Sequence, residues 1–193
     1  MALLSEGFRQ RMQAVNSAIR FCLAVLLVIF GNSIFAYAYA EGTELEYRVK
    51  SAFLYNFTKF IEWPAEVKKR PDFVICVAGN SQLHAKLVET IGDKKNNGVP
   101  IKFSGIKHPG EAQGCQMVFL EFADRGRLED WVGVLANEAV LTVSDDSSFV
   151  EMGGMIQFVI VDGKIRFDIN QTAASRSQIK MSSKLLGLAR NVN

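Results

Sequence analysis

The stretch Phe73-Val74-Ile75-Cys76-Val77-Ala78-Gly79 decides the predicted fold. Its run of apolar residues ends at a glycine, and this pattern is typical of a strand that is buried on both faces. Asn80-Ser81 follow as helix-cap residues, and a helical stripe comes next, made of Leu83, Leu87, Val88 and Ile91. Strand, turn and helix in this order open an α/β unit, so we predict a sheet that is built around this strand.

Further helices and strands are predicted on both sides of this stretch. A first helix is expected to begin at the capping box Thr43-Glu44-Leu45-Glu46 and to stop near Glu62-Trp63, ahead of Pro64. After the central strand and its helix we predict a turn over 93–98, strands over 99–106 and 115–122, a helix, a strand over 140–143, a helical turn over 149–152, strands over 155–161 and 164–169, and a closing helix over 171–190.

This order of elements predicts the fold class. Asp162-Gly163, between the last two strands, is a strong hairpin signal. We therefore predict a single α/β domain with a mostly parallel β-sheet, helices on both faces of the sheet, and a late antiparallel hairpin.

Residues 1–40 differ in composition from the rest of the chain. Three arginines precede an uncharged apolar run over 21–30, and Ala36-Tyr37-Ala38-Tyr39-Ala40 offers small residues at cleavage spacing. This pattern is typical of a secretory signal peptide, and the apolar run is shorter than a membrane-spanning helix requires. We predict cleavage near Ala40 and an exported domain over 41–193. The alternative is a retained N-terminal membrane anchor.

The predicted exported part carries balanced charge. Residues 1–40 hold three of the 22 basic residues and one of the 20 acidic residues, so 19 of each remain. This balance gives no basic footprint for nucleic acid.

Cys76 and Cys115 are the two cysteines after residue 40. Because an exported chain meets oxidising conditions, we predict that they form a disulfide. A zinc site that adds His84 and His108 is the alternative, but these intervals match no compact zinc module. A redox-active pair usually has C-x-x-C spacing, which is absent here.

No motif in the sequence indicates catalysis or a cofactor. The turn over 77–81 has one glycine where a dinucleotide-binding fingerprint has three, and there is no Walker-type loop. Neither His84 nor His108 has an evident acidic partner with which to activate Ser81. Asp145-Asp146 are typical of a turn after a strand. We therefore predict a protein that is not an enzyme and has no catalytic residues, no cofactor and no metal.

The most aromatic part of the chain lies at the end of the predicted first helix. A helix that docks on the sheet explains such rings, and the alternative is a pocket or a partner surface at Trp63-Pro64. The residues predicted for that surface are Tyr55, Asn56, Phe57, Trp63 and Pro64.

Residues 50–64 carry a resemblance to a known family. Their sequence, Lys-Ser-Ala-Phe-Leu-Tyr-Asn-Phe-Thr-Lys-Phe-Ile-Glu-Trp-Pro, resembles the opening signature of the YfiR-like periplasmic proteins. Further matches to that family follow in the family's order at 73–79, 140–145, 153–156, 169–170 and 185–186.

The resemblance implies a periplasmic α/β protein without catalysis. Such a protein binds the periplasmic sensor portion of a membrane-bound diguanylate cyclase and represses it, which lowers cyclic-di-GMP and restrains biofilm formation. The resemblance also implies a homodimer and a disulfide at Cys76–Cys115, whereas Val150 and Gln157 occupy the neighbourhood of a second cysteine pair found in some relatives. The alternative function is a periplasmic small-molecule receptor, in which Tyr55, Phe57 and Trp63 line an aromatic pocket.

Overall fold

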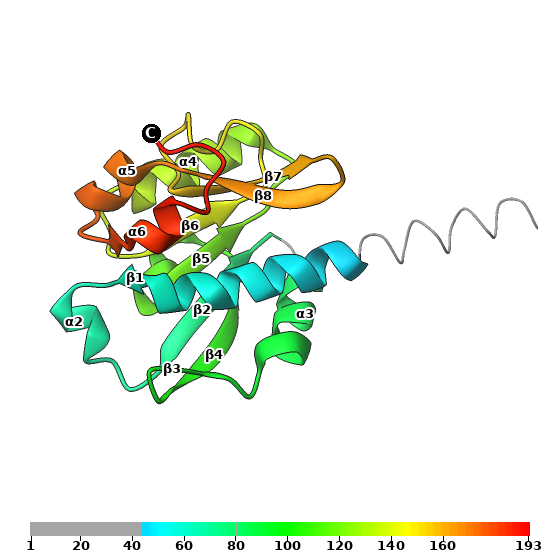
Figure 1. Cartoon of the computed structure of the whole chain (residues 1–193). Coiled ribbons are helices and arrows are strands. Elements are labelled where there is room, and N and C mark those ends of the chain that lie inside the picture. The colour runs from blue at the N-terminus through cyan, green and yellow to red at the C-terminus, as the bar shows by residue number, and fades with distance from the viewer. Residues whose placement is uncertain (1–43, 80) are drawn as a thin grey trace, which may run out of the picture. The chain divides into compact units, whose positions relative to one another are not determined.

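Seven strands form one sheet, and the strand over Phe73–Ala78 lies inside it (Figure 1). The computed structural model describes residues 44–79 and 81–193. The strands are β2 (Phe73–Ala78), β3 (Lys95–Asn96), β4 (Val99–Ile106), β5 (Met117–Leu120), β6 (Leu141–Ser144), β7 (Ile156–Val161) and β8 (Lys164–Ile169). Their order in the sheet is β3-β4-β2-β5-β6-β7-β8. The neighbours from β4 to β7 are parallel, and the outer pairs β3–β4 and β7–β8 are antiparallel.

Some sequence predictions fall outside the described residues. These are the signal peptide of residues 1–40 and the cap residues Thr43 and Asn80. Residues Glu46–Asn193 form one compact unit, and the two described residues that precede it, Glu44 and Leu45, are helical. Within residues 44–79 and 81–193, no helix is both long enough and apolar enough to cross a membrane.

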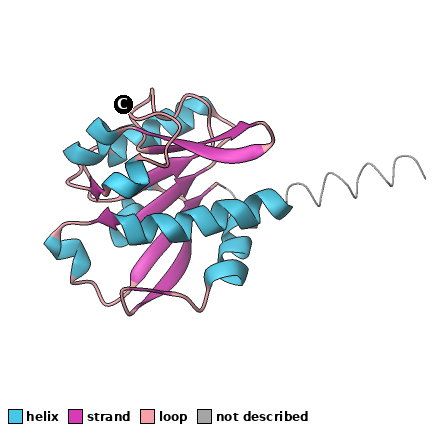
Figure 2. Cartoon of the chain, viewed as in Figure 1, coloured by secondary structure: helices cyan, strands magenta, loops and turns pink. Residues whose placement is uncertain are grey.

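Helices cover both faces of the sheet (Figure 2). On one face, the helical residues 46–60 share a hydrophobic core with α3 (Ser81–Ile91), α5 (Gln171–Arg176) and α6 (Ser183–Leu186). On the other face lie α4 (Arg125–Leu135) and the 3₁₀-helix η1 (Pro109–Gly114). A short helix, α2 (Ala65–Lys68), begins after Pro64, which is its N-cap residue.

The side chains of β2 alternate between these two cores. Phe73, Ile75 and Val77 belong to the core beneath the helix of residues 46–60, whereas Cys76 and Ala78 belong to the core beneath α4. Because successive side chains of a strand point to opposite faces, a strand that is covered on both sides needs apolar residues at every position. The predicted fold class, a single α/β domain with a mostly parallel sheet and a late hairpin, is confirmed.

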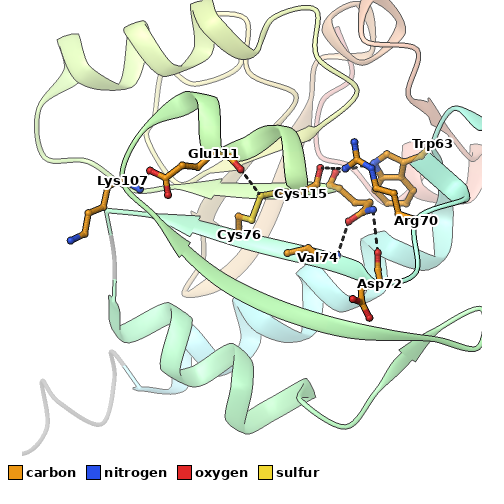
Figure 3. The surroundings of a disulfide bond; sticks show 9 residues. Trp63, Arg70, Asp72, Val74, Cys76, Lys107, Glu111 and Cys115 are labelled. Carbon is orange, nitrogen blue, oxygen red and sulfur yellow. Dashed lines mark hydrogen bonds between the residues drawn. A yellow bond between two sulfur atoms is a disulfide. The ribbon is translucent and has the colours of Figure 1, made fainter. Parts of the chain in front are cut away.

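Cys76 and Cys115 form a disulfide that joins β2 to the end of η1 (Figure 3). Their Cα atoms are 6.0 Å apart, and each residue is 1% exposed. Since both sulfur atoms are used in this bond, neither is available as a zinc ligand. The predicted strand over 115–122 begins only at Met117, because the Cys115 N–H donates to the oxygen of Ala112 and so closes η1.

Tight turns join the two antiparallel pairs. Asp162 and Gly163 have φ values of 49° and 68° at the tip of the β7–β8 hairpin, which was predicted from this dipeptide. Asn97 and Gly98, with φ values of 50° and 84°, join β3 to β4 in the same manner. The sequence predicted a turn over 93–98 but not β3, because two residues are too few for a periodic pattern.

The predicted closing helix over 171–190 is wrong. The chain instead forms α5, the short strand β9 (Lys180–Met181) and α6. α5 ends because Gln178 takes a φ of 57° and the Ile179 N–H bonds back to the oxygen of Ala174. β9 then pairs with β1 (Ile61–Glu62), and this pairing ends the first helix at residue 60, ahead of the predicted end.

The predicted helical turn over 149–152 is present as a single turn, in which the Met152 N–H donates to the oxygen of Ser148, and it does not extend into a helix. Residues 147–153 form turns, in which Gly153 has a φ of 103° and the Gly154 N–H donates to the oxygen of Phe149. The buried Phe149 ring lies directly against Gly154, so this segment is folded back on itself.

Candidate functional site

The helix of residues 46–60 runs between the two ends of the parallel strands. We call the end where these strands begin the amino edge of the sheet, and the end where they finish the carboxyl edge. Near its beginning, Tyr47 donates to a carboxylate oxygen of Glu121, which follows β5, and Lys50 pairs with Asp145, which follows β6. Beyond its end, Trp63 donates to Gln116, which precedes β5. The helix therefore runs antiparallel to the parallel strands, and polar or aromatic groups gather at each edge.

Trp63 lies at the amino edge of the sheet. It is 6% exposed, and its ring packs edge-on against Phe73 with the ring centres 5.0 Å apart. Its Nε1 donates a 2.9 Å hydrogen bond to the backbone oxygen of Gln116. The indole is thus fixed in direction by a hydrogen bond that is buried.

Gln116 connects the surrounding segments through hydrogen bonds. Its Oε1 accepts from the Val74 N–H at 2.6 Å, and its Nε2 donates to the oxygen of Asp72 at 3.4 Å. Its backbone oxygen accepts from both Trp63 and Leu141. Sequence reasoning did not single out Gln116, although a glutamine at the start of a predicted buried strand was the available signal.

Two of the five residues predicted for a partner or ligand surface are buried. Phe57 is 1% exposed, and its ring lies 5.1 Å from that of Phe167 and 5.9 Å from that of Phe158. It points to the sheet because it shares a helical face with Leu54. Phe57 is therefore a core residue. Trp63 is also buried, at 6% exposure, and only the part of its ring that borders the two hollows described below is accessible to a ligand or a partner.

The other three predicted residues remain accessible. Asn56 is exposed and accepts a hydrogen bond from Lys59, while Tyr55 and Pro64 are half-buried. The ammonium groups of Lys59 and Lys94 lie 4.1 Å and 5.2 Å from the centre of the Tyr55 ring. Tyr55 thus already has cationic neighbours within the chain.

Two hollows lie on either side of Trp63. One is an open groove of about 810 Å³ between α2, α5 and the β1–β9 pair, and Pro64 borders it as well. The other is a smaller cavity of about 270 Å³, bordered by β1, α2 and the β3–β4 turn. The region at Trp63-Pro64 is therefore hollowed.

Lys50 carries a buried charge at the opposite, carboxyl edge. The residue is 3% exposed, and its Nζ lies 2.6 Å from Glu46 Oε1 and 2.5 Å from Asp145 Oδ2. Burial by itself lowers the pKa of Lys50, but the charges and hydrogen bonds of Asp145 and Glu46 outweigh it and raise this pKa above its ordinary value. Sequence reasoning did not single out Lys50. The available signal for a buried lysine was its place on the apolar face of the helix, one turn before Leu54.

Replacing Lys50 by methionine is expected to destabilise the protein by about 2 kcal/mol at pH 7, because two partly buried carboxylates lose their counter-charge. Urea unfolding measures this difference. Because the folded-state pKa of Lys50 is raised, the stabilisation is complete below the ordinary lysine pKa and disappears only as the pH rises through the raised value. The control Lys69→Met, at an exposed residue, should change stability by less than about 0.5 kcal/mol. Equal stability of Lys50→Met and wild type at pH 7 would contradict this account.

The carboxyl edge is closed where β2 meets β5. Sheets of this class usually bind ligands at the carboxyl ends of two strands where the chain order switches direction, and here those strands are β2 and β5. A Cβ atom placed on Gly79 would lie only 1.9 Å from the backbone oxygen of Glu121. The two strand ends therefore touch at this point.

The two histidines lie on different elements, His84 on α3 and His108 at the start of η1. His84 has a buried Nε2 without a hydrogen-bond partner, and His108 begins η1, where its backbone N–H donates to Glu111 at 3.0 Å. Among the residues that the structure describes, no three side chains of His, Cys, Asp or Glu form a group that could hold a metal ion.

Comparison with known proteins gives one family and several distant structures. A model of the family described as YfiR/HmsC-like matches residues 47–190. A solved conserved domain protein from Vibrio cholerae O1 biovar eltor is 16% identical, with a TM-score of 0.44 over 62% of this chain and 54% of that one. An ABC domain in complex with L-Trp from Streptococcus pneumonia is 12% identical, with a TM-score of 0.43 over 63% of this chain and 55% of that one. The chain thus spans about half the length of these solved structures.

Proposed function

The chain belongs to the YfiR/HmsC-like family, and from this membership we propose that it is a non-enzymatic regulator in the periplasm. In this proposal it binds the periplasmic sensor portion of a membrane-bound diguanylate cyclase and represses the synthesis of cyclic-di-GMP, which restrains biofilm formation. The observation that carries the proposal is the family match over residues 47–190, which spans nearly the whole compact unit.

The charge of the chain supports recognition through apolar contacts. With 19 basic and 19 acidic residues after residue 40, long-range attraction contributes little to affinity. Binding then depends on a few apolar anchors inside a polar rim. The β7–β8 hairpin offers such an anchor, because Ile160 is 64% exposed and its cross-strand partner Ile165 is half-buried.

Deletion of the gene tests the proposal in cells. We expect cyclic-di-GMP and surface adhesion to rise, because the cyclase loses its repressor. The increase should vanish when the partner cyclase is deleted as well. Unchanged cyclic-di-GMP in the single deletion, under conditions where the protein is expressed, would reject repression.

Replacing Ile160 by aspartate tests the hairpin as part of the partner surface. We expect at least a tenfold loss of affinity for the cyclase sensor portion, measured by calorimetric titration, with the unfolding midpoint unchanged. Val134→Asp is the matched control, since Val134 is similarly exposed, at 57%, but lies on α4. Equal losses of affinity in both variants would show that the hairpin is not part of the interface.

The proposal includes a homodimer, as the family membership implies. Light scattering of the purified protein at micromolar concentrations measures its mass, and a monomer at every concentration would exclude this part of the proposal.

A further inference from the structure

The cavity of about 270 Å³ beside Trp63 has an apolar side and a polar side. The rings of Trp63 and Phe73 and the aliphatic side chains of Ile61, Val67 and Val99 form the apolar side. The polar side is formed by Lys68, Arg70, Asp72, Asn96, Asn97 and Gln116. Apolar walls with a few convergent polar groups are the usual composition of a small-molecule site.

Two of these side chains, Lys68 and Arg70, give the cavity a positive charge. Asp72 is already paired with Lys102, whose Nζ lies 2.7 Å from its Oδ2. Arg70 uses its Nη1 for a long contact of 3.4 Å with the oxygen of Cys115 (Figure 3). Within the described part of the chain, no carboxylate forms an ion pair with Arg70 or Lys68. An arginine fork beside a lysine is well suited to bind a carboxylate.

Asn96 adds a polar group without a partner. The residue is 9% exposed, and its Oδ1 makes no hydrogen bond. Buried polar atoms in folded proteins nearly always have a partner. Because Asn96 borders the cavity, a turn of its amide towards the cavity would let Oδ1 accept from a ligand hydroxyl.

We propose that this cavity binds a small aromatic hydroxycarboxylate. Arg70 and Lys68 bind the carboxylate, the walls beside Trp63 and Phe73 enclose the ring, and Asn96 accepts from the hydroxyl. The volume sets the size of the ligand, since the cavity is slightly smaller than the range for drug-sized molecules. This site does not depend on repression of a cyclase, and its test uses the isolated protein.

Calorimetric titration with 4-hydroxybenzoate tests the site. The full chain is expressed, exported and purified, and we expect saturable binding of one molecule per chain. Two related probes separate the contribution of the hydroxyl from that of the carboxylate charge. Benzoate, which lacks the hydroxyl, should bind at least fivefold more weakly than 4-hydroxybenzoate. The uncharged 4-hydroxybenzamide should bind at least tenfold more weakly. Emission of Trp63 in a Trp131→Phe variant gives a second readout, because Trp131 belongs to the core on the other face of the sheet. Absence of a saturable signal in both measurements, or equal affinity for the carboxylate and the amide, overturns the proposal.

Substitutions of residues that border the cavity test whether 4-hydroxybenzoate binds there. Lys68→Gln and Arg70→Gln should each weaken 4-hydroxybenzoate binding at least tenfold, and Asn96→Ala should remove the preference for 4-hydroxybenzoate over benzoate. Lys69→Gln is the matched control, because Lys69 is exposed and does not border the cavity. Thermal unfolding of each variant shows whether the fold is retained. An equal loss in Lys69→Gln and Lys68→Gln, or a persistent hydroxyl preference in a folded Asn96→Ala variant, would refute the assignment.

Discussion

The Gly79→Ala variant is expected to lose about 3 kcal/mol or more of its free energy of unfolding, a large part of the stability of a typical domain. Gly79 has a φ of 95°, a conformation that side chains of L-residues rarely adopt. An added Cβ would also lie 1.9 Å from the oxygen of Glu121 and 2.9 Å from the ring of Phe122. The chain cannot move aside cheaply, because the Glu121 N–H donates to the oxygen of Ala78, at the junction of β2 and β5.

Urea unfolding of the purified protein measures this loss. Gly163→Ala separates backbone strain from steric overlap, since Gly163 has a φ of 68° but nothing within 4 Å of its added Cβ. That control should lose only about 1–2 kcal/mol, the cost of the left-handed conformation alone. If Gly79→Ala lost no more than Gly163→Ala, the close contact between the ends of β2 and β5 would not exist in solution.

Removal of the disulfide is expected to have an effect of similar size. The Cys76→Ala, Cys115→Ala double variant should lose about 4 kcal/mol, because the bond joins residues separated by 39 positions and restricts the unfolded chain. Alanine is used in place of serine because both positions are 1% exposed and a buried hydroxyl adds its own cost.

Reducing agent provides the control for this second prediction. The wild-type protein should lose stability when it is reduced, whereas the double variant should not respond. The intact mass of the unreduced protein should be lower by two hydrogens than that of the reduced protein. Two thiols that react with an alkylating reagent before reduction would contradict the bond.

The two edges of the sheet differ in a way that bears on function. At the carboxyl edge, Lys50 neutralises Asp145 and the ends of β2 and β5 touch. At the amino edge, Trp63 separates a groove from a cavity, and Arg70 and Lys68 lack acidic partners among the described residues. The cavity that Lys68 and Arg70 border therefore lies opposite the edge where α/β proteins usually bind ligands, while a hollow of about 490 Å³ borders Lys50 and Asp145 at that other edge.

Local sequence patterns determined the fold class and most of its elements. The apolar run at 73–79 required a strand covered on both faces, and Asp162-Gly163 required a tight hairpin. These features depend on neighbouring residues alone, since periodicity and turn conformation are properties of short segments. The same local signals located the aromatic segment that ends at Trp63-Pro64.

Tertiary structure alone decided where the chain departs from those patterns. β1 pairs with β9 across most of the length of the chain, so no local signal showed that the closing helix would be split. Phe57 and Trp63 are buried because of the segments that pack against them, and Lys50 is a buried ion because Asp145, which follows β6, pairs with it. Burial, ion pairs and cavities depend on contacts between segments that are far apart in sequence, and a pattern within one segment does not contain them.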